Sequence, residues 1–130
     1  MPATPWKKVG EVDPVRDYLA LLSYLPLKHR WRIPSVVLHT RRIVAQLQQT
    51  SGLVGFAMMA RPLRRQFWTL SVWDNDGALQ AFVDAGSHAV TMRAMTPHVG
   101  ATRFIRWKVR GVDLPPSWDD AFDRWSAGGG

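Results

Sequence analysis

The side chains best suited to chemistry gather between Arg65 and Met95. This stretch holds an indole at Trp73, an imidazole at His88 and a thioether at Met92. Imidazole readily exchanges a proton near neutral pH, and it is also a frequent ligand of metal centres. The stretch therefore predicts a site in which His88 acts as a proton shuttle or as an axial ligand beside an aromatic wall.

The direction of the His88 side chain depends on Gly86 and Ser87. If one helix runs unbroken through this region, His88 lies nearly opposite the preceding apolar stripe and points to solvent. If Gly86 ends that helix and Ser87 caps a new one, His88, Met92 and Met95 share a face at i, i+4 and i+7. Two interpretations stay open: a local hydrogen bond at a helix N-terminus, or a place in a pocket.

The strand expected at residues 66–73 alternates its side chains between two faces. One face carries two aromatic rings and two hydroxyl groups, from Phe67, Thr69, Ser71 and Trp73. A few polar groups within an apolar surface are typical of a ligand pocket. The alternatives are a core or interface position for Trp73 and cross-strand pairing for the two hydroxyl groups.

Three further residues border the same space if their strands face it: Tyr24, Met58 and Arg106. Arg106 would neutralise an acidic group of a substrate or cofactor, and the alternative is an ordinary surface position. The chain has no cysteine and no spacing of histidines or acids that suits a metal ion. We therefore expect no metal site built from side chains alone.

The periodicity of the apolar residues places these side chains on an α+β domain. The expected strands are 17–27, 53–60, 66–73 and 102–109, with a helix after the first strand and another after the third. This order is that of the ferredoxin-like, split βαβ fold, in which four antiparallel strands carry both helices on one face. We expect an irregular arm at 1–16, this domain at 17–112, and a C-terminal flap with a frayed tail at 113–130.

The expected strands are apolar on both faces, although two helices can cover only one face. An apolar sheet face of this size is larger than soluble monomers usually expose. We therefore expect a homodimer, a dimeric α+β barrel, in which the open faces of two sheets enclose a partly apolar interior. Trp118, Phe122 and Trp125 would cover the partner or the edge of the sheet.

The formal charge of +7 admits an anionic ligand, nucleic acid or simple solvation of the surface. The basic residues are scattered and no nucleic-acid-binding motif accompanies them, so nucleic acid ranks last as a partner. No apolar run approaches the roughly 20 residues that span a bilayer, and the N-terminus does not resemble a secretory signal. We expect a cytoplasmic protein without membrane contact.

The segment FWTLSVWDNDGALQAFVDAGSHAVTMR, residues 67–93, resembles the dimeric α+β barrel superfamily, which includes the antibiotic-biosynthesis monooxygenases. It is most similar to the DUF3291 and spheroidene-monooxygenase-like branches, whose pattern is a strand F-W-T-V-S-x-W, an acidic cap and A-F-x-x-x-x-x-H. By this resemblance, Trp73 matches an indole that lines the heme pocket of heme-degrading members, and His88 matches the histidine of the spheroidene-monooxygenase-like pattern. Met92 stands where the heme-degrading members place their ligand histidine.

The resemblance implies a monooxygenase-like enzyme that acts on an apolar, polycyclic or polyene small molecule in a pocket between sheet and helices. Trp73 would line the pocket, and His88 would be the axial ligand of a heme or a proton donor. The cofactor is then either none or a heme held by His88, Met92 and Arg106. The alternative is a non-catalytic dimer of the same fold that binds heme or another small molecule.

Overall fold

A computed structural model of the protein describes residues 4–28, 33–61, 64–85, 90, 93 and 102–127. His88 and Met92 lie outside the described residues. The same holds for Gly86 and Ser87, on which the predicted direction of His88 depends.

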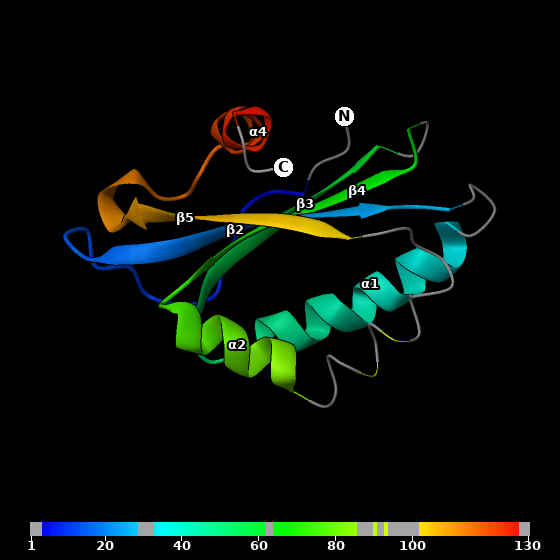
Figure 1. The fold of residues 1–130 in the computed structure, drawn as a ribbon. Helices are drawn as coiled ribbons and strands as arrows, with labels where there is room; N and C mark the ends of the chain where they lie inside the picture. Colours follow the sequence, from blue (N-terminus) through cyan, green and yellow to red (C-terminus); the bar gives the residue numbers. More distant parts are fainter. Residues whose placement is uncertain are drawn as a thin grey trace.

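The described strands form one antiparallel sheet, shown in Figure 1. They are β1 (Lys7–Lys8), β2 (Asp17–Pro26), β3 (Leu53–Arg61), β4 (Gln66–Trp73) and β5 (Arg103–Arg110). They lie in the order β1-β3-β4-β2-β5, and each neighbouring pair is antiparallel. The sheet therefore has five strands among the described residues, whereas the sequence predicted four. Strand β1 was missed because two residues of the N-terminal arm show no periodicity.

Helices lie on both faces of this sheet. Helices α1 (Ile33–Gln48) and α2 (Asp76–Asp84) lie on one face, and α4 (Trp118–Ser126), which follows the short 3-10 helix η4 (Gly111–Asp113), lies on the other (Figure 1). The order β2-α1-β3-β4-α2-β5, with β4 between β2 and β3, is that of the split βαβ fold. The predicted α+β class and element order are thus confirmed. No helix in the described part of the chain is long and apolar enough to cross a membrane.

Polar side chains fix the starts of two helices. Asn75 caps α2, because its Oδ1 accepts a hydrogen bond from the Ala78 backbone N–H at 2.9 Å. Asp76, in the first turn of α2, places negative charge at the positive end of the helix dipole. Ser117 caps α4 in the same way, with its Oγ 3.0 Å from the Asp120 backbone nitrogen.

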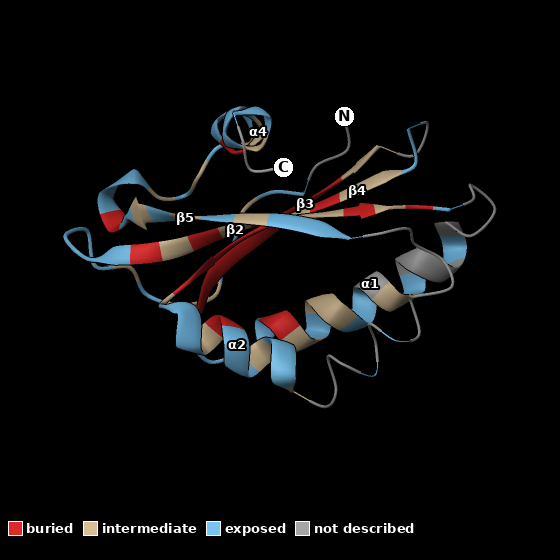
Figure 2. Cartoon of the chain, in the orientation of Figure 1, coloured by how far each residue is buried: buried red, intermediate tan, exposed pale blue. Residues whose placement is uncertain are grey.

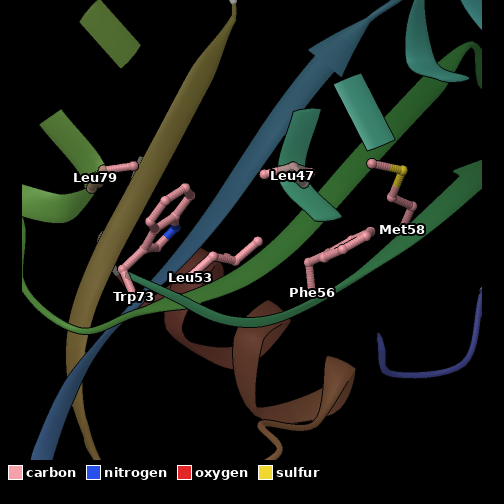
Figure 3. Packing of buried hydrophobic residues seen from close by; sticks show 6 residues of the cluster. All are labelled: Leu47, Leu53, Phe56, Met58, Trp73 and Leu79. Atoms are coloured by element: carbon pink, nitrogen blue, oxygen red, sulfur yellow. The ribbon is translucent and has the colours of Figure 1, made fainter. Parts of the chain in front are cut away.

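The two faces of the sheet are named here after β4. The inner face carries Thr69, Ser71 and Trp73 beneath α1 and α2. The outer face carries Trp68 and Leu70 beneath α4, and Val72 beside them. Six buried residues form the core of the inner face: Leu47, Leu53, Phe56, Met58, Trp73 and Leu79. Figure 3 shows these side chains, which come from α1, β3, β4 and α2 and pack against one another. Trp73, only 1% exposed, is the last residue of β4 and the largest of the fully buried side chains.

The outer face is covered by the chain itself. Leu22 and Leu70 are 0% exposed, and they share a cluster with Ala121 and Phe122 of α4. Figure 2 shows the buried residues of β3 between the helical layers. The sequence argument for a dimer assumed that this face is open, and that assumption is wrong because α4 covers it. The homodimer itself stays a prediction.

Trp6, in the N-terminal arm, also packs on the outer face, over Gly55 of β3. A Cβ atom built on Gly55 would lie 2.6 Å from atoms of the Trp6 indole, which is closer than real side chains approach. Glycine at this position therefore gives the ring its place, beside the irregularity between Leu53 and Gly55 where the β3–β4 register shifts. The arm is thereby tied to the sheet.

Trp118, Phe122 and Trp125 were expected to cover the partner or the sheet edge. They lie instead over the outer face of their own chain, grouped with Trp68. The rings of Phe122 and Trp125 meet the Trp68 ring edge to face, with centroids 5.0 and 5.1 Å from it. The C-terminal segment is therefore a layer of the fold in the described chain.

Candidate functional site

A cavity of about 430 Å³ lies between the inner face of the sheet and helices α1 and α2. Its volume falls within the range of about 300–1,000 Å³ that is typical of small-molecule sites. Most of the lining is apolar: Leu21, Leu25, Ile43, Leu47, Met58, Phe67, Trp73, Leu79, Phe82, Val83 and Phe104. Polar lining residues are Ser23, Thr69, Ser71, Gln80, Thr102, Arg103 and Arg106. The cavity therefore suits a largely apolar ligand that a few polar groups orient.

Three hydroxyl groups lie next to one another on the sheet side of the cavity. Ser23 of β2 is directly opposite Thr69 of β4, and Ser71 follows two residues later on the same face of β4. Residues directly opposite each other in antiparallel strands have Cβ atoms roughly 4.5–5.5 Å apart. Ser23, Thr69 and Ser71 thus form one polar area, the hydroxyl patch, within apolar surroundings.

Ser71 and Trp73 are linked by a buried hydrogen bond. The Nε1–H group of Trp73 donates to Oγ of Ser71 at 3.0 Å, and Ser71 is 3% exposed. Because a serine hydroxyl has one donor proton and two acceptor sites, Ser71 can accept this bond and still donate to a ligand. The Trp73 ring also packs against Phe82 of α2, with centroids 5.3 Å apart. Trp73 therefore forms an apolar wall and holds the Ser71 oxygen in place.

Arg106 of β5 lies at the rim of the cavity. Its Nη1 is 3.0 Å from Oδ1 of Asp76, the first residue of α2. Its guanidinium group also lies over the Phe104 ring, 5.6 Å from the ring centroid. Phe104 is 57% exposed, so the rim presents a cation beside an accessible aromatic ring.

The structure brings together six of the residues predicted for the site. Met58, Phe67, Thr69, Ser71, Trp73 and Arg106 all line the cavity. Their catalytic or binding roles stay predictions. The same holds for His88 and Met92, which lie outside the described residues.

The prediction that Tyr24 borders the cavity is wrong. Its ring lies on the outer face, with its centroid 4.6 Å from that of Trp68. Strand β2 presents Ser23 and Leu25 to the cavity, and successive side chains of a strand point to opposite faces. Tyr24 therefore belongs to the layer beneath α4.

Sequence reasoning missed the contribution of Ser23. Strand β2 is apolar at both parities, so neither of its faces stands out as the cavity face. The signal that identifies Ser23 is its register with Thr69, which requires knowing how two strands far apart in sequence pair. Phe82, by contrast, falls on the apolar stripe expected for α2, and its position toward the sheet follows from that stripe.

The described lining does not fit a heme. Haem iron is held by His, Cys, Met or Tyr, and of these only a thioether, that of Met58, occurs in the described lining of the cavity. A methionine ligand usually accompanies a histidine. Among the described residues no group of three or more His, Cys, Asp or Glu could hold a metal ion.

No protein-family model matches the sequence, and no curated protein matches it. Solved structures of similar fold are found at low sequence identity. SnoaB, a cofactor-independent oxygenase from Streptomyces nogalater, is 13% identical with a TM-score of 0.61, over 78% of this chain and 100% of that chain. An antibiotic biosynthesis monooxygenase is 13% identical with a TM-score of 0.63, over 68% of this chain and 95% of the other. A conserved protein from Methanosarcina mazei Go1 is 8% identical with a TM-score of 0.64, over 69% and 90%.

These similarities concern the fold, because every identity is far below the level at which activity carries over. They agree with the resemblance of residues 67–93, although they do not single out the DUF3291 branch. The chain therefore shares its fold with these solved structures, among them an antibiotic biosynthesis monooxygenase and a cofactor-independent oxygenase.

Proposed function

We propose that the protein is a monooxygenase-like enzyme that oxidises an apolar, electron-rich polycyclic or polyene molecule in the cavity beneath α1 and α2. The observation that carries the proposal is the hydroxyl patch within an otherwise apolar cavity of about 430 Å³. Such a site binds an apolar ring system and orients it by its oxygen atoms. The similar fold of SnoaB, a cofactor-independent oxygenase, supports oxygen chemistry on a scaffold of this kind.

A substrate with an acidic C–H bond next to a carbonyl or phenol system can itself supply electrons to O₂. The net reaction is R₂CH₂ + O₂ → R₂C=O + H₂O. The carbon loses four electrons and O₂ gains four; one oxygen atom enters the product, and the other leaves as water with both hydrogens. Because the substrate is the reductant, the protein has to bind it, exclude water and stabilise charge on its oxygen.

The hydroxyl patch is placed to stabilise that charge. When the substrate loses a proton, negative charge develops on its oxygen, and hydroxyl donors fixed beforehand stabilise this charge strongly in a water-excluded site. Ser71 is suited to this role because Trp73 already occupies one of its acceptor positions and leaves its proton free. Thr69 and Ser23 add donors from the same face.

The proton acceptor in this proposal is His88, on the strength of the resemblance alone. The described lining of the cavity includes no carboxylate and no imidazole. That observation also favours a second candidate function, a non-catalytic binding protein that uses the same cavity. Both the enzyme and the binding protein would bind the ligand in the cavity, but only the enzyme would oxidise it.

The test uses 1,8-dihydroxyanthrone as probe, with O₂ uptake followed by an electrode and ¹⁸O₂ as the labelled oxidant. We expect uptake of one O₂ per probe molecule, with one labelled oxygen in the product. Thr69→Val and Ser23→Ala should each lower kcat/KM about tenfold, since each removes one hydrogen bond to the developing charge. Ser51→Ala, in an exposed turn, serves as the control and should keep the wild-type rate.

Probe that binds without oxidation above the protein-free rate would contradict the enzyme and support the binding protein. A loss of activity in Ser51→Ala equal to that in Thr69→Val would contradict the role of the hydroxyl patch. Titration with hemin tests the heme alternative, which predicts a Soret band that disappears in His88→Ala.

A further inference from the structure

The ion pair between Arg106 and Asp76 joins the two elements that flank the cavity at its rim. Arg106 comes from the edge strand β5 and lines the cavity, and Asp76 begins α2. The side chains are 49% and 75% exposed. Ion pairs that remain this exposed contribute little to stability, because water screens them and two long side chains must be held in place. Replacing one partner of this ion pair by another group therefore lowers the free energy of unfolding only slightly.

Neither member of the pair is left without support when the other is exchanged. Asp76 stays in the first turn of α2, where the helix dipole and water both favour its negative charge. Arg106 stays over the Phe104 ring, a contact that holds the guanidinium group beside the cavity. Both residues are thus arranged for a change of partner.

The contact with Asp76 uses one nitrogen and one oxygen, Nη1 and Oδ1, at 3.0 Å. A guanidinium group binds a carboxylate more strongly through two parallel hydrogen bonds. A ligand carboxylate at the rim can meet the guanidinium group of Arg106 through both of its oxygens. Such a carboxylate is therefore a stronger partner for Arg106 than the one it has.

We propose that the cavity accepts an apolar ring compound bearing a carboxylate, and that this carboxylate replaces Asp76 as the partner of Arg106. The ion pair then acts as a latch that an acidic ligand opens and a neutral ligand leaves closed. The inference rests on the proposed binding cavity and adds the charge and orientation of its ligand. The carboxylate of the ligand lies at β5, and the ring system of the ligand reaches toward the hydroxyl patch.

The strand register sets the length of this ligand. Arg106 is opposite Leu21 of β2, and Leu21 is opposite Ser71 of β4, so Arg106 and Ser71 lie in one row across the sheet. Two strand spacings separate them, about 10 Å at roughly 4.8 Å per spacing. This length suits three fused rings that carry the carboxylate at one end.

The experiment compares two fluorescent probes of nearly equal shape, anthracene-2-carboxylate and its neutral amide, by titration of the full-length protein at physiological salt. The wild type should bind the acid about tenfold more tightly than the amide. Arg106→Gln should weaken binding of the acid about tenfold and change binding of the amide less than twofold. Asp76→Asn should tighten binding of the acid two- to fivefold, because it frees Arg106, and leave the amide unchanged.

Arg110→Gln is the matched control. It removes the same charge from the same strand, and Arg110 pairs with Asp17 at 3.8 Å away from the cavity. Its expected effect on either probe is less than twofold. If Arg110→Gln weakens binding of the acid as much as Arg106→Gln does, the effect is a general electrostatic one and the proposal is wrong. The proposal is also wrong if Arg106→Gln weakens binding of the acid and the amide equally. It fails as well if Asp76→Asn does not tighten binding of the acid. Failure of this inference is separate from failure of the proposed function, because oxidation of the uncharged anthrone does not depend on the latch.

Discussion

Replacement of Phe122 by alanine tests whether α4 closes the outer face of the sheet in the chain's own fold. Phe122 is half-buried and meets the Trp68 ring edge to face at 5.0 Å. The guanidinium group of Arg61 also lies over the Phe122 ring, 4.7 Å from its centroid. These contacts connect α4 to β3 and β4, so their loss should release the helix.

The expected loss of stability follows from the burial of the Phe122 side chain and from its ring contacts. Truncation of a fully buried phenylalanine costs about 3–5 kcal/mol, and half of that, about 2 kcal/mol, applies to a half-buried ring. The aromatic pair with Trp68 adds about 0.5–1.5 kcal/mol, and the cation–π contact with Arg61 adds about 0.5–1 kcal/mol. We expect Phe122→Ala to lower the free energy of unfolding by about 3–4.5 kcal/mol.

The assay is urea unfolding followed by far-ultraviolet circular dichroism at two protein concentrations tenfold apart. Phe104→Ala is the control, since it removes the same atoms from a ring that is 57% exposed, and it should cost less than about 1 kcal/mol. Equal costs for the two variants would refute the docking of α4. A wild-type midpoint that rises with protein concentration would show that folding is coupled to association, as the predicted homodimer requires.

Two further substitutions test single contacts by urea unfolding. Ser71→Ala should lower the free energy of unfolding by about 1–3 kcal/mol, because it leaves the buried Nε1–H of Trp73 without its acceptor. In a Trp73→Phe background, which lacks that donor, the same substitution should cost less than about 0.5 kcal/mol. Equal costs in both backgrounds would contradict the hydrogen bond. Gly55→Ala should cost about 1–3 kcal/mol because its methyl group displaces Trp6, and the cost should largely vanish in a Trp6→Ala background. A cost that persists without the indole would place the strain in the β3 backbone.

Most elements of the fold were predictable because each one carries its own local signal. The alternation of β4 separates Thr69 and Ser71 from Leu70 without reference to any other strand, and the structure keeps that separation. The same is true of the helix caps at Asn75 and Ser117, where a short polar side chain precedes an amphipathic segment.

What sequence reasoning did not reach depends on relations between distant segments. The side of β2 that faces the cavity is set by its pairing with β4 and β5, and an apolar strand read alone gives no sign of it. Tyr24 was assigned to the wrong face for that reason. The pairing of Arg106 with Asp76, thirty positions earlier in the chain, also depends on a distant segment. The same is true of the cover of the outer face by α4.

The cover supplied by α4 bears on the site as well as on stability. Strand β4 carries Trp68 and Leu70 on one face and Thr69 and Ser71 on the other, so the layer beneath α4 and the cavity share one backbone. A strand buried on both faces has a strongly specified register, because a slip of one residue would exchange the two sets of side chains. The register is what places Ser23 opposite Thr69. The C-terminal helix, although it does not touch the cavity, therefore helps to position the hydroxyl patch, and loosening it should weaken ligand binding together with stability.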